Sequence, residues 1–111
     1  MAPRIATRLL VDALIRRAEA GSGFAAVIAK GDPSSGALLV LITCRGSDPI
    51  VYERLLAPSG DYLWSETRGA ANAEETRKFL EKRRRGDPDL WVLELDVPEV
   101  ERFVAEMNAL G

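Results

Sequence analysis

Two uninterrupted apolar runs lie close together in the first half of the chain. One covers residues 24–29 (FAAVIA), the other covers residues 37–42 (ALLVLI), and the polar segment 30–36 (KGDPSSG) separates them. The Asp, Pro, Ser and Gly of that segment favour a tight turn. The pattern predicts a β-hairpin at the centre of the fold. Because neither run alternates with polar residues, both faces of each strand are expected to be covered.

Further strands are predicted in the rest of the chain. Residues 50–56 and 62–67 follow the turn-forming segments 45–49 and 58–61. Such short connections make an antiparallel meander of four strands the simplest topology. Residues 90–97 form a fifth predicted strand, in which apolar and polar positions alternate. That alternation indicates one buried face and one wetter face.

Three helices are predicted around these strands. The first covers residues 4–20, the second runs from about Asn72 to Gly86, and the third carries an apolar stripe from Val100 to Met107. The whole chain, residues 1–111, is therefore expected to be one α+β domain. Its elements follow the order α-β-β-β-β-α-β-α, an antiparallel meander with a fifth strand, flanked by the three helices.

The first predicted helix is apolar around most of its circumference. Arg8, Asp12 and Arg16 follow one another at i, i+4 spacing and leave only a narrow polar stripe. A helix that packs on one sheet face needs a narrower apolar stripe than this one. The helix is therefore expected to contact another helix or a second subunit, and the protein is expected to be a homodimer.

Composition removes several kinds of chemistry. The chain has 111 residues, a net charge of -2, one cysteine and no histidine. Without histidine, a Ser-His or Cys-His nucleophile and a Cys/His zinc site are excluded. One cysteine cannot form an internal disulfide, which fits a reducing compartment. The sequence predicts no signal peptide and no membrane span, so a cytoplasmic protein without a cofactor is expected.

A basic cluster closes the second predicted helix. Arg83, Arg84 and Arg85 could bind phosphate or a nucleic-acid backbone, because Arg makes bidentate contacts to phosphate oxygens. The favoured interpretation is a solvated helix end, where the macrodipole stabilises cations in any case.

Three aspartates in two Gly-Asp-Pro turns could form a carboxylate site. Asp32 lies in the first turn, and Asp87 and Asp89 lie at the second. Together they could bind a divalent cation, or one could act as a base, if the two turns meet in space. The favoured interpretation is structural, with Asp87 beginning the turn before Pro88 and Asp89 paired with a nearby arginine.

Two further groups remain open at the level of sequence. Tyr52, Tyr62 and Trp64 share one side of the third and fourth predicted strands. If no helix covers them they are a partner-binding patch, and otherwise they are core. Cys44 could be a reactive thiol, although an inert packed thiol is favoured.

Three stretches carry a family resemblance, namely the first predicted helix from Arg8 to Ala18, the segment Gly31–Ala37 between apolar strands, and the segment Arg85–Val92 leading to Glu94. In these the chain resembles a small alphaproteobacterial family catalogued only as a domain of unknown function. The resemblance implies a small cytosolic bacterial protein and brings no activity, cofactor or catalytic residue. One departure is Gly86, where an aromatic residue is expected before Asp-Pro-Asp.

The function expected from these observations is a non-enzymatic protein–protein or small-ligand binding module. The first alternative is binding of nucleic acid or phosphate through Arg83, Arg84 and Arg85. The second alternative is a carboxylate-based, metal-assisted enzyme that uses Asp32, Asp87 or Asp89.

Overall fold

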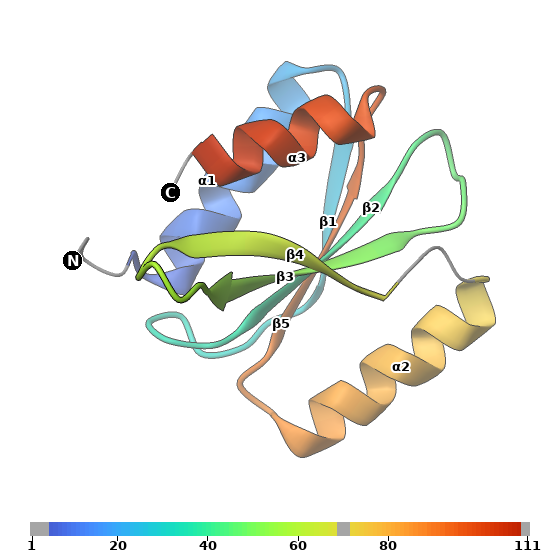
Figure 1. The fold of residues 1–111 in the computed structure, drawn as a ribbon. Helices are drawn as coiled ribbons and strands as arrows, with labels where there is room; N and C mark the ends of the chain where they lie inside the picture. Colours follow the sequence, from blue (N-terminus) through green and yellow to red (C-terminus); the bar gives the residue numbers. More distant parts are fainter. Residues whose placement is uncertain (1–4, 69–71, 110–111) are drawn as a thin grey trace.

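A mixed sheet with helices on both faces forms the body of the molecule (Figure 1). The computed structural model describes residues 5–68 and 72–109, and in these ranges it places three helices against a five-stranded sheet. This confirms the predicted α+β class and the predicted order of elements. The elements are α1 (Thr7–Ala20), β1 (Phe24–Ala29), β2 (Leu38–Thr43), β3 (Ile50–Leu56), β4 (Tyr62–Arg68), α2 (Ala73–Gly86), β5 (Trp91–Asp96) and α3 (Val100–Ala109).

The helices begin close to where the sequence predicts them. Residue 4, the predicted start of the first helix, lies outside the described residues, and the helix begins at Thr7. The second helix begins after Asn72, whose side-chain oxygen accepts a hydrogen bond of 2.8 Å from the backbone N–H of Glu75. Within the described ranges, no helix combines the length and the apolar composition that crossing a membrane requires.

The strand order is β1-β5-β2-β3-β4, and it corrects the predicted topology. The predicted hairpin between residues 24–29 and 37–42 is wrong, because β5 lies between β1 and β2. β5 runs antiparallel to β1 and parallel to β2. Only β2, β3 and β4 form the expected meander. The connection from β1 to β2 therefore crosses the end of β5 and does not close a hairpin.

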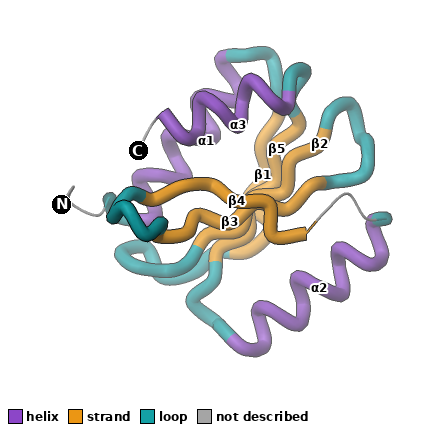
Figure 2. Tube along the Cα trace, in the orientation of Figure 1, coloured by secondary structure: helices purple, strands orange, loops and turns teal. Residues whose placement is uncertain are grey.

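One face of the sheet is covered by α1 and α3 (Figure 2). Side chains from both helices meet alternate residues of the central strands, as the period of two along a strand requires. In β2 these are Leu38, Val40 and Ile42, and in β5 they are Trp91, Leu93 and Leu95. This is the larger of two buried clusters, and Leu14 of α1 is fully buried in it.

The opposite face is covered by α2, and only in part (Figure 2). Phe79 and Leu80 of α2 pack against a smaller cluster that includes Leu39, Leu41 and Val92. Every residue of β2 is buried, as its continuous apolar run predicts.

β1 is much more exposed than its continuous apolar run predicts. Its residues Phe24, Val27 and Ile28 are 77%, 38% and 53% exposed. The expectation that both faces of residues 24–29 are covered is therefore wrong. The physical reason is position, because β1 is an edge strand and only its last residue, Ala29, is buried in the smaller cluster on which α2 packs.

The two Gly-Asp-Pro turns meet and hold β5 in place. The backbone N–H of Asp32 donates to the carbonyl of Asp89 over 3.0 Å, and the Trp91 indole N–H donates to the carbonyl of Asp32 over 2.7 Å. Gly31 and Gly36 pack so closely on Asp89 that a Cβ atom at either position would overlap its carbonyl oxygen. The two turns thus fix the start of β5 against the connection from β1 to β2.

This close approach predicts that Gly31→Ala destabilises the protein by about 1–3 kcal/mol, because the added methyl group meets backbone that cannot move aside. Gly86→Ala is the matched control, since a Cβ atom there meets no other atom within 4 Å. Urea unfolding followed by circular dichroism measures both. Equal unfolding free energies for Gly31→Ala and the wild type would contradict the packing described here.

Candidate functional site

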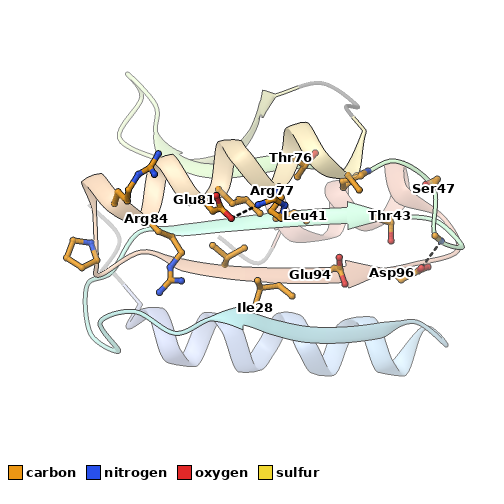
Figure 3. Close-up of a pocket in the computed structure, with 17 residues that line it drawn as sticks. Ile28, Leu41, Thr43, Ser47, Thr76, Arg77, Glu81, Arg84, Glu94 and Asp96 are labelled. Atoms are coloured by element: carbon orange, nitrogen blue, oxygen red, sulfur yellow. Dashed lines mark hydrogen bonds and ion pairs between the residues drawn. The ribbon is translucent and has the colours of Figure 1, made fainter.

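A groove of about 930 Å³ lies between α2 and the part of the sheet that α2 leaves uncovered (Figure 3). Its floor is formed by strands β1, β5 and β2, and Ile28, Leu41 and Val92 make it apolar. One wall is the flank of α2 that carries Thr76, Leu80 and Arg84. The loop after β2 borders one end, and Pro88 borders the other. A volume of this size is typical of small-molecule sites.

The position of α2 explains why the groove exists. The guanidinium of Arg83 donates two hydrogen bonds to the carboxylate of Glu53 on β3, over 3.1 and 2.9 Å. Phe79 and Leu80 add the apolar contacts of the smaller core. Both interactions draw α2 toward β2 and β3 and away from β1. The floor at Ile28 is therefore left open to solvent.

The end of the groove near Pro88 is basic. Arg84 and Arg85 both line it, and in the described ranges neither forms an ion pair. Arg77, about two turns before Arg84 on the same helix, is instead paired with Glu81 over 2.7 Å. Figure 3 shows this ion pair and the side chain of Arg84 on the α2 side of the groove. Two cations therefore remain available at this end.

The other end of the groove carries carboxylates from β5. Asp96 accepts hydrogen bonds from the backbone N–H groups of Arg45, over 2.8 Å, and of Gly46, over 3.0 Å. These bonds, that from Arg45 above all, hold the pKa of Asp96 below its usual value of 3.8. Asp96 is therefore engaged in fixing the loop after β2. Glu94 lines the same region and forms no ion pair with any described residue.

Thr76 lines the groove from α2 and is 3% exposed. Among the described residues, its hydroxyl oxygen has no hydrogen-bond partner. A buried hydroxyl without a partner costs about 1–3 kcal/mol, and a water or ligand atom in the groove would remove that cost. Thr76 is thus a second polar feature of the groove besides its charged ends.

The basic cluster predicted from the sequence is divided by the structure. Arg83 points to β3 and is held by Glu53, which raises the pKa of the Arg83 guanidinium above its usual value. Arg84 and Arg85 lie on the groove instead. The three arginines therefore do not form one surface.

The three candidate aspartates are brought close through their backbones, and the carboxylates of Asp32 and Asp87 accept hydrogen bonds within their own turns. The Asp32 carboxylate accepts hydrogen bonds from the backbone N–H of Ser34 and from the N–H and hydroxyl of Ser35, which lowers the pKa of Asp32. The Asp87 carboxylate accepts from the N–H of Asp89. In the described part of the chain, no group of three or more Cys, Asp or Glu side chains could hold a metal ion.

The aromatic side chains of β3 and β4 lie on the face that α1 and α3 cover. Trp64 is buried, and its backbone N–H donates to the side-chain oxygen of Asn108 on α3 over 2.8 Å. Tyr52 packs against the larger core, and burial raises the pKa of its hydroxyl. The Arg54 guanidinium lies over the Tyr62 ring at 4.5 Å. Because Trp64 is buried and belongs to the larger cluster, it is a core residue.

Cys44 lies at the end of β2 and is partly exposed. Its thiol lies 3.6 Å from the carbonyl oxygen of Pro98, to which it donates. Arg45, its neighbour in sequence, contacts Asp96 through its backbone N–H. The thiol therefore contacts the segment that leads into α3.

Several groove residues were not predicted as site residues from the sequence. Ile28, Leu41 and Val92 read as ordinary strand residues, and Thr76 reads as an ordinary helix residue. A signal was present only for Glu94 and Asp96, which occupy the predicted wetter face of the last strand. The apolar floor is found only once β5 is placed between β1 and β2.

Comparison with known proteins identifies relatives over most of the chain. Residues 5–105 match the sequence model described as "Protein of unknown function (DUF1491)". The chain is 32% identical to a DUF1491 family protein from Caulobacter crescentus CB15 whose crystal structure was solved at 1.87 Å, with a TM-score of 0.80 and coverage of 90% of this chain and 94% of that one.

A second solved structure is the solution structure of protein Atu0922 from A. tumefaciens, at 30% identity and a TM-score of 0.79, covering 92% of this chain and 93% of that one. An NMR structure of a DUF1491 family protein from Caulobacter crescentus CB15 gives 31% identity and a TM-score of 0.78, covering 93% of this chain and 94% of that one. Among curated proteins, none matches the chain. The resemblance to an alphaproteobacterial family of unknown function is confirmed.

The ion pair on α2 predicts different roles for two adjacent arginines. Arg83→Ala is expected to lower the free energy of unfolding by about 1–3 kcal/mol, because it leaves Glu53, whose side chain is 14% exposed, without its bidentate partner. Arg84→Ala is expected to stay within about 0.5 kcal/mol of the wild type. Urea titration measures both, and equal effects at the two positions would exclude a stabilising role for the Arg83 pair.

The hydrogen bonds to Asp96 predict a pH dependence. Because the pKa of Asp96 is lower in the folded state than the usual 3.8, its stabilisation is complete well above that value and is lost as the pH falls through the folded-state pKa. Asp96→Asn is therefore less stable than the wild type near neutral pH, and the difference shrinks below about pH 4.

Unfolding by urea at several pH values measures this difference. Asp48→Asn removes an equal charge from the loop after β2 and controls for net charge. A gap between Asp96→Asn and the wild type that stays constant down to about pH 3 would rule out the carboxylate as its origin.

Proposed function

We propose that this chain, which belongs to the DUF1491 family, is a non-enzymatic binding module whose α2 groove holds a small amphipathic anion. The ligand has an elongated apolar body, which lies on the floor of the groove, and an anionic group, which lies at the end near Pro88.

The observation that carries the proposal is the pair of unengaged arginines at the basic end. Arg84 and Arg85 border an apolar floor and form no ion pair in the described ranges, whereas Arg77 and Arg83 on the same helix are paired with Glu81 and Glu53. Guanidinium groups bind carboxylate, sulfonate and phosphate oxygens in a bidentate manner. An anionic group is therefore the polar feature that this end of the groove best accommodates.

The shape of the floor supports an elongated ligand. Val92 and Asp96 lie on the same face of β5, four residues apart, so they are separated by about 13 Å at about 3.3 Å per residue. Ile28 and Leu41 extend the apolar surface onto the neighbouring strands. An apolar body bound along this line gains from burial of its surface, and Glu94 lies toward the end opposite the arginines.

The roles of the aspartates support binding rather than catalysis. The carboxylates of Asp32 and Asp87 accept backbone hydrogen bonds within their own turns, and Asp96 does the same for the loop after β2. Each is a group that general acid–base chemistry would need free and close to a substrate. The engagement of Arg83 with Glu53 likewise removes one cation from the basic surface that a nucleic-acid partner would need.

The proposal predicts saturable binding of 8-anilinonaphthalene-1-sulfonate, a probe with an aromatic body and one sulfonate. The double variant Arg84→Gln/Arg85→Gln is expected to weaken its affinity at least about tenfold, because charge-assisted hydrogen bonds contribute about 1.5–3 kcal/mol. Fluorescence titration at low and high salt measures the affinity.

The matched control is Lys78→Gln/Lys82→Gln, which removes the same charge from the same helix without touching the groove. It is expected to leave the affinity within about twofold of the wild type. If the two double variants lose affinity equally, the effect is one of net charge and the groove is not the site.

A further inference from the structure

β1 presents an open sheet edge with an apolar surface on both sides. Phe24 and Ile28 lie on the α2 side, and Ala25 and Val27 lie on the side of α1. Phe24 is 77% exposed, and β1 has a hydrogen-bonded neighbour on one side only. An exposed apolar edge of this kind favours pairing with another strand.

We infer that β1 pairs antiparallel with β1 of a second copy of this chain, so that the sheet continues through a two-fold axis. A register centred on Ala26 places Phe24 opposite Ile28 of the second copy, and Ala25 opposite Val27 of the second copy. Apolar side chains then meet on both faces of the new pair. The register shift between Val27 and Ala29 leaves Ile28 outside the regular ladder of β1. Regular pairing across the two-fold axis is therefore centred on residues 25–27, and the side chains of Phe24 and Ile28 meet at its two ends.

The choice of a second copy, rather than another partner, follows from charge complementarity on α1. This helix packs over β1 and β5, whereas α3 packs over β4. Arg17 faces α3, where it donates to Glu106 over 3.0 Å. Helical geometry turns the opposite flank, with Arg8 and Glu19, toward the open edge. Figure 3 shows α1 running alongside β1 at this edge.

A two-fold axis at the β1 edge brings the α1 helices of the two copies side by side and antiparallel. Arg8 of each copy then lies near Glu19 of the other, and Asp12 lies near Arg16 of the other. The same two-fold axis therefore pairs opposite charges on the two α1 helices and apolar side chains on the two β1 strands. An isologous interface requires this self-complementarity.

The interface differs from the one that the sequence predicts. Leu10, Val11, Leu14 and Ala18 of the first helix are buried against the sheet, whereas Leu9 of the same helix is 58% exposed. The neighbouring strand β1 exposes three large apolar side chains, those of Phe24, Val27 and Ile28. The expected homodimer is therefore assigned to the β1 edge, with the charged flank of α1 beside it.

The pairing has a consequence for the groove. A two-fold axis normal to the sheet places both α2 grooves on one face, and it brings Phe24 of the second copy next to Ile28, which lines the groove. The partner copy then extends the apolar floor on its open side. This consequence rests on the proposed function, whereas the pairing of β1 strands does not depend on any ligand.

Sedimentation equilibrium of the ligand-free protein tests the pairing. At micromolar concentration, the wild type is expected to have twice the 12.1 kDa mass of one chain. Phe24→Glu/Ile28→Glu is expected to be a monomer, because it sets like charges opposite each other across the two-fold axis. Mixing it with Phe24→Lys/Ile28→Lys is expected to restore the dimer mass. Both positions are exposed, so folding is retained and is checked by circular dichroism.

The matched control is Leu56→Glu, at an exposed apolar position near the opposite edge of the sheet, which is expected to leave the dimer intact. A monomeric wild type, a dimer that survives Phe24→Glu/Ile28→Glu, or a dimer that Leu56→Glu also dissociates would each overturn the inference. Because the measured quantity is mass without ligand, none of these outcomes bears on whether the groove binds an anion.

Discussion

The structure depends on the insertion of β5 between β1 and β2. This one strand pairs with both neighbours, and its side chains enter the buried clusters on both faces of the sheet. The contact between the two Gly-Asp-Pro turns fixes where β5 begins, through the hydrogen bond from Asp32 to Asp89 and the one from Trp91 to Asp32. The order of strands, the two-sided burial of β2 and the exposed position of β1 all follow from it.

The same insertion creates the groove. With β5 inserted between β1 and β2, the sheet is wider than the single helix α2 can cover, and the Arg83–Glu53 pair holds that helix toward β3. The floor near Ile28 remains open, and the next residues along α2, Arg84 and Arg85, face the groove instead of β3. Arg83 is therefore a structural residue because it is paired with Glu53, whereas Arg84 and Arg85 remain available to a ligand.

Local patterns in the sequence predict the elements well, and they fail where two distant segments must be placed together. The cap at Asn72, the turn at Asp32 and the buried run of β2 are all decided by neighbouring residues. The strand that pairs with β1 in the sheet is not decided by residues nearby in the sequence, because an apolar run fits beside any buried strand. The partner of Arg83 lies 30 residues away on β3, so an arginine in a basic cluster gives no sign of it.

Binding in the α2 groove is tested most directly by titrating the wild-type protein with 8-anilinonaphthalene-1-sulfonate. Proton–nitrogen correlation NMR follows the assigned backbone amide signals during the titration. Binding in the α2 groove predicts saturable shifts confined to Ile28, Val92, Glu94 and the segment 76–85 of α2. Shifts concentrated on α1 and α3, or spread evenly over the sheet, would contradict the claim that the uncovered side of α2 is the binding surface.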